Sequence, residues 1–288
     1  MSLPVFLPGP AQTALLGLGL SLLIAALAYW RGSLTRSGAV GAVLTGTLIF
    51  SIGSLTWGIL LVAFFVTSSA LSHYKEHAKA PLAEKFQKGH RRDIGQVLAN
   101  GGWGALTALA FGAYAHPVFF AAFAGAMATV NADTWATELG VLSKTVPRRI
   151  TDGKAVPVGT SGGITPLGTL VAFLGALLIG VLAFLFLLAL PDARLVPARS
   201  SGLILFPLVI AAAGSLGSLF DSLLGATVQA IYYCDFDQKE TEASVHRCGR
   251  PARWIRGWRW LDNDWVNFLA SIAGSLLAVG LFQVATAF

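Results

Sequence analysis

Long apolar runs, separated by short polar stretches, recur along the whole chain. Each run is about as long as a helix needs to cross a bilayer, where a helix satisfies its own backbone hydrogen bonds. We predict eight such helices, at residues 11–30, 38–52, 55–73, 95–113, 117–133, 164–190, 203–231 and 264–286. The runs at 38–52 and 55–73 are short, glycine-rich and separated only by the sequence SIGS, so a re-entrant pair is an alternative for them.

The composition agrees with a membrane-embedded chain. Of the 288 residues, 55% are hydrophobic and 12% are charged, and the mean hydropathy is +0.68. Soluble domains carry about 25% charged residues. No polar stretch is long enough to form a separate soluble domain. We therefore predict one integral membrane domain over residues 1–288, an all-α polytopic transmembrane helix bundle.

The basic residues lie between the predicted helices. Counting the helices as above puts 18 of the 20 lysines and arginines on one side, mostly in loops at 74–94, 139–163 and 232–262. Basic loops favour the cytoplasmic side. We expect these loops inside, both termini outside, and the protein in the bacterial inner membrane or an equivalent membrane. The net charge of +6 then reflects topology and contact with lipid, and nucleic acid is excluded as a partner because no aromatic-lined basic platform is present.

Three acidic residues stand within or at the edge of apolar segments, where an unpaired charge is costly and a functional role is the first hypothesis. They are Asp133 and Glu138, in MATVNADTWATELGVL, and Asp221, in AGSLGSLFDSLLGATVQA. The alternative is a buried acid that is bonded to a helix end or paired with an arginine. On helices, Asp133 shares a face with Thr137 while Glu138 points elsewhere, and Asp221 lies in a stripe of small residues that also suits helix packing.

Further polar residues occur near the same predicted ends of their helices. Asn100 lies near the start of the fourth helix, and the last helix opens with Asn263, Asp264 and Asn267. Asn263 or Asp264 can also be only an N-cap, but Asn267 is too far inside the helix for that role. Oxygen ligands that converge from several helices suit Mg²⁺, which keeps some of its waters and is often shared with substrate phosphates. We therefore expect Mg²⁺ as a cofactor.

The loop LSKTVPRRITDGKAVPVGTSGGITPLG supplies groups that can bind a phosphate. Its side chains are basic, and its glycine-rich turn can direct backbone N–H groups at an anion just before a helix. The basic residues are Lys144, Arg148, Arg149 and Lys154, and the turn comprises Gly159, Thr160, Ser161, Gly162 and Gly163. No Walker A sequence occurs. The G-x-S-x-G match around Ser161 is a poor indication of a nucleophile, since neither His116 nor His246 lies inside a predicted span where it could act as the base.

Cys234 and Cys248 are the two cysteines of the chain, and both fall in a loop expected to be cytoplasmic, where disulfides are rare. With Asp237 and His246 they can form a zinc site, but C-x2-D with H-x-C is an incomplete zinc pattern. The alternative is a pair of free thiols.

Five sequence blocks, in this order, closely resemble one integral-membrane family: KGHRRDIGQVLANGG, ADTWATELGVLSKTVPRRI, VGTSGGIT, GSLFDSLLGATVQ and NDWVN. This family, defined by domain of unknown function 92, contains the plant phytyl-phosphate kinase of vitamin E synthesis and the vertebrate transmembrane protein 19. The resemblance runs from about Thr35 to about Ser275. The second block is also similar to a looser pattern of CTP-dependent polyprenol kinases and CDP-diacylglycerol synthases. Family members often have a further cysteine where this chain has Asp237.

The resemblance implies a Mg²⁺-dependent isoprenyl-phosphate kinase, which transfers a phosphoryl group from a nucleoside triphosphate, with CTP favoured, to phytyl or geranylgeranyl phosphate. Asp133 and Asp221 would hold the metal, Glu138 and Lys154 would assist catalysis, and the basic and glycine-rich loop would bind the triphosphate. Supporting roles are implied for Arg91, Arg92, Asn100, Asn131, Thr134, Ser218, Gln229, Asn263, Asp264 and Asn267. The alternatives are an ion-coupled transporter, whose intramembrane acids bind the coupling ion, and cytidylyl transfer to a lipid phosphate.

Overall fold

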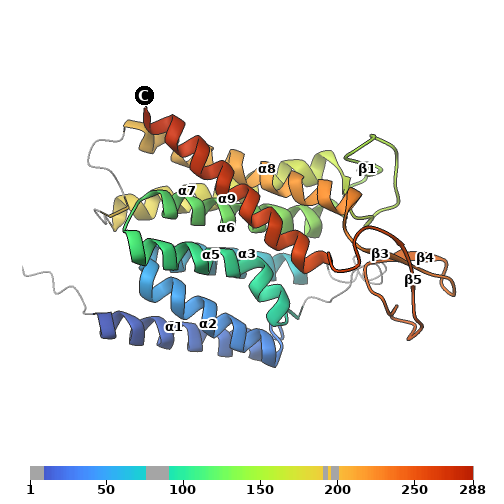
Figure 1. Ribbon diagram of the computed structural model, residues 1–288, viewed down its shortest axis with the longest axis horizontal. Coiled ribbons are helices and arrows are strands. Elements are labelled where there is room, and N and C mark those ends of the chain that lie inside the picture. Colours follow the sequence, from blue (N-terminus) through green and yellow to red (C-terminus); the bar gives the residue numbers. More distant parts are fainter. Residues whose placement is uncertain (1–9, 76–90, 191–193, 196–200, 288) are drawn as a thin grey trace, which may run out of the picture.

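The computed structural model describes residues 10–75, 91–190, 194–195 and 201–287. Within them the chain forms eight long α-helices that run back and forth along the long axis of a bundle (Figure 1). They are α1 (Pro10–Trp30), α2 (Arg36–Gly53), α3 (Leu55–His73), α5 (Ile94–Tyr114), α6 (Val118–Gly140), α7 (Pro166–Ala189), α8 (Phe206–Thr227) and α9 (Asn263–Ala287). A 3₁₀ turn (Ser201–Leu205) leads into α8. Most of the predicted loop 74–94 lies outside the described residues.

The predicted helical membrane fold is confirmed, and each predicted apolar run forms a helix. Among the described helices, six are long and apolar enough to cross a membrane, namely all except α5 and α6. The uncertain pair, α2 and α3, has 18 and 19 residues, and both helices are among these six. They meet at Ser54, whose φ of 86° turns the chain sharply. Their length makes two separate crossings the simpler interpretation.

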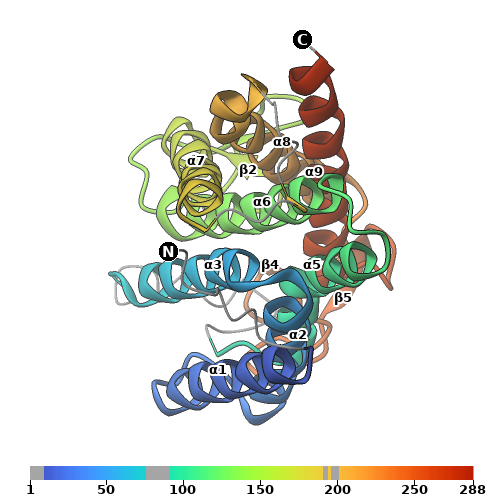
Figure 2. The same ribbon diagram turned by 90° about the vertical axis from the view of Figure 1, so that its left-hand side faces the viewer.

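The central helix of the bundle is α6, with α3, α5, α7, α8 and α9 packed around it (Figure 2). Every residue from Phe120 to Ala132 is buried. The neighbours approach closely because glycines face α6: a Cβ on Gly217 of α8 or on Gly274 of α9 would strike the side chain of Thr129. Since other helices separate it from lipid, α6 can carry polar residues in its second half without exposing them to hydrocarbon.

Two helix ends differ from the prediction by four residues or more. The prediction ended α6 at residue 133, but the helix continues for about two turns, to Gly140. The polar residues of these turns do not break the helix because α3 and α8 supply hydrogen-bond donors, Ser72 for Glu138 and Ser218 for Asp133. Conversely, α8 ends at Thr227 rather than at residue 231, because the chain there enters a β-strand.

Two small antiparallel sheets, which the sequence analysis did not predict, lie at one end of the bundle (Figure 1). In the first, β1 (Arg148–Arg149) pairs with β2 (Gly163–Ile164). The second has the strand order β4-β3-β5 and comprises β3 (Ile231–Cys234), β4 (Lys239–Thr241) and β5 (Arg253–Arg256). We call residues 228–262 the sheet lobe, and the end of the bundle that carries both sheets the loop-rich end.

Candidate functional site

A cavity of about 550 Å³ lies at the loop-rich end of the bundle. Its walls come from α3, α5, α6, α7, α8, α9, the glycine-rich turn and the sheet lobe. The predicted site residues that line it are Arg92, Asn100, Asp133, Thr134, Glu138, Gly159, Thr160, Ser161, Gly162, Gly163, Ser218, Asp221, Gln229, Asn263, Asp264 and Asn267. Residues from all five sequence blocks thus meet around one space.

Asp133 and Asp221 enter the same part of the cavity from α6 and α8. Ser218 lies one turn before Asp221, and its hydroxyl donates a long hydrogen bond of 3.5 Å to Oδ1 of Asp133. The carboxylate of Asp221 is also close enough to those of Asp133 and Glu242 to interact with them electrostatically. Oδ2 of Asp221 is buried and has no hydrogen-bond partner among the described residues. A divalent cation would satisfy this oxygen, which is otherwise costly to bury.

The small-residue stripe of α8 explains why the aspartates are close. A Cβ on Gly214 would lie 2.6 Å from Cβ of Ala128, and one on Gly217 would strike Thr129, so the backbones of α8 and α6 are in direct contact. The stripe therefore serves helix packing, and this packing sets the position of Asp221 relative to α6.

Glu138 and Arg92 form a second charged part of the cavity wall. Oε1 of Glu138 accepts a hydrogen bond of 2.6 Å from the hydroxyl of Ser72, on α3. The guanidinium of Arg92 lies over the rings of Phe64 and Phe65, 5.2 and 5.4 Å from their centroids, and its Nη1 is buried with no hydrogen-bond partner in the described chain. Burial lowers the pKa of Arg92 to about 10, while the charge of Glu138 acts to raise it. Arg92 is therefore cationic at neutral pH.

The glycine-rich turn is fixed against α8 and the sheet lobe. Gly162 has a φ of +80°, and a Cβ there would lie 2.5 Å from the backbone nitrogen of Ala226. The hydroxyl of Ser161 donates to Oε1 of Glu242 at 2.7 Å, and Nε2 of Gln229 donates to the same oxygen at 3.0 Å. Because Ser161 is bonded to a carboxylate and not to an imidazole, the structure gives no support to a serine nucleophile.

Part of the turn's backbone is already engaged. The N–H groups of Thr160 and Gly163 donate to the carbonyls of Pro157 and Thr160, at 3.2 and 2.9 Å. The turn can therefore offer an anion fewer N–H groups than its length suggests.

The four basic residues predicted to bind phosphate do not line the cavity. Arg149 and Lys154 lie 3.4 and 3.5 Å from Asp152, and Arg148 donates to the carbonyl of Gly153 at 2.8 Å. Lys144 is exposed. Their hairpin nevertheless adjoins the cavity wall, because β1 pairs with β2 and the backbone N–H of residue 150 donates to the carbonyl of residue 162 at 3.0 Å.

Two of the predicted supporting residues also lie outside the cavity lining. Asn131 is fully buried: its Nδ2 donates to the carbonyl of Gly175 at 2.8 Å, and the hydroxyl of Thr67 donates to its Oδ1 at 3.1 Å, so it ties α6 to α7 and α3. Arg91 is exposed and donates to the carbonyl of Leu34 at 3.4 Å.

The structure adds residues that the sequence analysis did not select. Asp262 caps α9, accepting a hydrogen bond of 3.1 Å from the backbone of Trp265; the cap is thus neither Asn263 nor Asp264, and both of these line the cavity. Glu242 and Arg247 enter from the sheet lobe, whose fold was not predicted.

Among the described residues that line the cavity, carboxylates outnumber cationic groups. The acids are Asp133, Glu138, Asp221, Glu242 and Asp264, and the basic residues are Arg92 and Arg247. A polyphosphate would be repelled by this charge balance unless cations accompany it, whereas the two guanidinium groups offer fixed points of attachment for phosphate oxygens.

Comparison with known proteins agrees with the resemblance seen in the sequence blocks. The family described as integral membrane protein DUF92 matches residues 19–275. The chain belongs to this family. It is 35% identical over 272 residues to Protein PGR of Arabidopsis thaliana, covering 90% of this chain and 92% of that protein. It is 30% identical over 252 residues to the uncharacterized membrane protein MJ0933 of Methanocaldococcus jannaschii, covering 86% of each.

A third relative of this DUF92 protein is Protein VTE6, chloroplastic, of Arabidopsis thaliana. The identity is 26% over 256 residues, which cover 87% of this chain and 66% of that protein. No solved structure matches the chain. The comparisons therefore establish the family and its membrane character.

Replacing Gly162 with Ala is expected to lower the free energy of unfolding by about 3 kcal/mol, because backbone strain at positive φ adds to the displacement of α8. The matched control is Gly153→Ala, at a φ of +68° with nothing within 4 Å of the added Cβ, which should cost only about 1 kcal/mol. Thermal unfolding in detergent compares the two variants. Equal shifts of the unfolding midpoint would show that the close packing of the turn against α8 does not contribute to stability.

Proposed function

We propose that this DUF92 protein is a Mg²⁺-dependent isoprenyl-phosphate kinase, which transfers the terminal phosphoryl group of a nucleoside triphosphate, with CTP favoured, to a prenyl monophosphate. The bond between the γ-phosphorus and its bridging oxygen breaks, a new bond forms to an oxygen of the acceptor phosphate, and the nucleoside diphosphate leaves. Phytyl and geranylgeranyl phosphate are the expected acceptors.

The observation that carries this proposal is the junction of the polar cavity with an apolar pocket. The pocket, of about 70 Å³, lies between α1, α2, α3 and α5, and it shares Arg92, Gln96 and Asn100 with the cavity. Such a junction fits an amphiphile with an anionic head: the phosphate would lie at Arg92, whose Nη1 has no hydrogen-bond partner in the described chain, and the start of the tail would lie among the apolar residues.

The aspartate pair fits Mg²⁺, which proteins usually bind through one or two carboxylates together with substrate phosphates. The buried, unpartnered Oδ2 of Asp221 beside Asp133 is the feature that supports this fit. When bound there, Mg²⁺ would neutralise charge on the triphosphate. Arg247 would contact the triphosphate from the sheet lobe. The basic hairpin that contains β1 adjoins the cavity wall through β2 and would lie near the triphosphate as well.

The chain's residues would act mainly by placing two anions together. The acceptor oxygen is already anionic, so the reaction needs no strong base. This agrees with a described cavity lining that contains no histidine. Arg92 would hold the acceptor phosphate and the walls around it would exclude water, which would otherwise compete as the acceptor.

The position of the cavity supports an enzyme over an ion-coupled transporter. The described residues that line it all lie toward the loop-rich end of their helices, whereas a transport path must open to each side in turn. We place this end in the cytoplasm, where nucleoside triphosphates are found, because most basic residues of the chain belong to its loops. The similarity to VTE6 also supports a kinase, because the sequence blocks of this chain resemble a family that includes the plant phytyl-phosphate kinase.

The proposal is tested by incubating detergent-purified protein with Mg²⁺, phytyl or geranylgeranyl monophosphate, and CTP, ATP, GTP or UTP in turn. Mass spectrometry follows the lipid and nucleotide products. Prenyl diphosphate and nucleoside diphosphate in equal amounts are the expected result, and protein carrying Asp221→Asn serves as the control for contaminating kinases. A CDP-lipid with pyrophosphate would replace the proposal with cytidylyl transfer. Folded protein that turns over none of these pairs would contradict both.

A further inference from the structure

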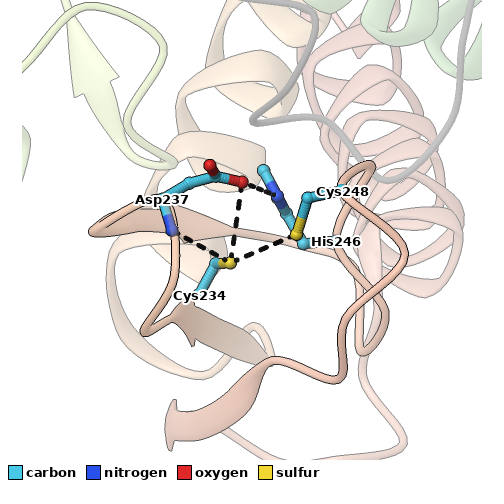
Figure 3. Close-up of side chains that lie close together, drawn as sticks. All are labelled: Cys234, Asp237, His246 and Cys248. Atoms are coloured by element: carbon cyan, nitrogen blue, oxygen red, sulfur yellow. Dashed lines mark hydrogen bonds and ion pairs between the residues drawn. The ribbon is translucent and has the colours of Figure 1, made fainter.

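Four residues that are separated along the sequence of the sheet lobe lie close together in space (Figure 3). Cys234 ends β3, Asp237 lies in the turn before β4, and His246 and Cys248 come from the loop between β4 and β5. One potential metal-binding atom from each side chain can be chosen such that all four atoms lie within 4.8 Å of one another. Among the described residues, this is the one group of three or more His, Cys, Asp or Glu side chains with such spacing.

Two distances from Sγ of Cys234 match the edges of a metal tetrahedron. The sulfurs of Cys234 and Cys248 are 3.7 Å apart, and Sγ of Cys234 is 3.8 Å from Oδ2 of Asp237. Two sulfurs that bind one tetrahedral zinc ion at about 2.3 Å lie about 3.8 Å apart. A disulfide would require a separation of about 2.05 Å, so the observed sulfurs are not bonded to each other.

Among the described residues, the ring nitrogens of His246 have no polar partner outside this group of four. His246 is 3% exposed; Nε2 of its ring has no hydrogen-bond partner in the described chain, and Nδ1 is paired with Oδ2 of Asp237 at 2.8 Å. Burying Nε2 without a hydrogen-bond partner is unfavourable. A metal ion between the histidine and the carboxylate would remove this cost.

We propose that Cys234, Asp237, His246 and Cys248 bind one zinc ion. Two thiolates, an imidazole and a carboxylate form a ligand set typical of Zn²⁺, while Mg²⁺ and Ca²⁺ prefer oxygen ligands alone. Because the protein supplies four ligands, no position stays open for a substrate, and the site is structural. It is distinct from the aspartate pair in the cavity and does not depend on the proposed kinase activity.

The zinc ion would order a lobe that is too small to be stable through its own core. Units of fewer than about 40 residues usually need metals or disulfides. Ordering of the sheet lobe would affect the cavity, because Arg247 lies between the ligands His246 and Cys248 in the sequence and lines the cavity wall. Glu242, which holds the glycine-rich turn through Ser161, lies in the same lobe. Zinc would thus fix one wall of the cavity from outside it.

The test measures zinc in protein that is purified in detergent without chelators. Elemental analysis should find about one zinc per chain, and Co²⁺ exchanged into the site should give the absorbance of thiolate-bound tetrahedral cobalt. Since the chain has only two cysteines, alkylation reads the site directly: both thiols should resist a maleimide until a chelator is added, after which both react.

Cys234→Ser and Cys248→Ser should each lose the zinc, whereas Asp235→Asn, an exposed neighbour paired with Arg253 at 3.5 Å, should keep it. Asp237→Cys should also retain zinc and bind it more tightly, which keeps the proposal testable if the serine variants fail to fold. Folded wild-type protein that neither contains zinc nor takes it up from added Zn²⁺ would overturn the proposal. A protein mass lower by two hydrogens, which indicates a disulfide, would overturn it as well.

Discussion

Replacing Asp221 with Asn is expected to lower turnover by about 100- to 1,000-fold or more, while the midpoint of thermal unfolding stays the same or rises. The activity is expected to fall because the substitution removes a carboxylate that would hold Mg²⁺ beside the triphosphate. Stability does not fall because the buried Oδ2 of Asp221 has no partner to lose, and a neutral amide is less costly to bury than a carboxylate. Steady-state kinetics with prenyl phosphate and CTP, alongside thermal unfolding, measures both effects.

Asp133→Asn should behave in the same way, because the amide keeps an oxygen that can accept the long hydrogen bond from Ser218. The matched control is Asp152→Asn, which removes a carboxylate from the exposed basic hairpin and should leave turnover within about twofold, as surface ion pairs contribute little. Normal turnover in Asp221→Asn would rule out the aspartate pair as the metal site. A large drop in the unfolding midpoint would instead identify Asp221 as a structural acid.

Replacing Arg92 with Gln is expected to raise KM for the prenyl monophosphate by about 10- to 100-fold and to change KM for the nucleotide much less. A charge-assisted hydrogen bond contributes about 1.5–3 kcal/mol, and each 1.4 kcal/mol corresponds to a factor of ten in affinity. Arg92 is suited to this role because its guanidinium is held over Phe64 and Phe65 with Nη1 buried and unpartnered in the described chain. Initial rates at varied concentrations of each substrate separate the two constants.

The neighbouring Arg91 provides the control, since it is exposed and lies outside the cavity lining. Arg91→Gln should leave both constants unchanged. Arg92→Lys retains the charge but loses the second donor, so its KM should fall between those of the wild type and of Arg92→Gln. An unchanged KM for the prenyl phosphate in Arg92→Gln would place the acceptor elsewhere in the cavity and remove the junction as the basis of the proposal.

The helices were predictable because lipid imposes a long apolar run on each span, and this signal is local in sequence. Their ends were less predictable. The helix α6 continues past Asp133 because Ser72 and Ser218, far along the chain, provide partners for its acids. A prediction that considers only neighbouring residues ends such a helix at its first charged residue.

The candidate site was likewise only partly predictable from the sequence. Asp133 and Asp221 were found from sequence since charges inside apolar runs are conspicuous. Arg247 and Glu242 were missed because they belong to a polar connection in which every residue looks solvated, and only the unpredicted sheet turns them toward the cavity. The zinc ligands were recognised as a fragmentary pattern, and their convergence depends on the register of β3 with β4, which spacing alone does not reveal.

The enclosure of α6 by five other helices also bears on how the protein is made. Its polar second half keeps α6 out of the set of helices that are apolar enough to cross a membrane by themselves. When α6 leaves the ribosome, α7, α8 and α9 have not yet been synthesised, so Asp133 would face lipid if the helix moved into the bilayer alone. Stable insertion of α6 is therefore expected to wait for its later neighbours, and a chain that stops before α9 leaves α6 without one of the helices that cover it.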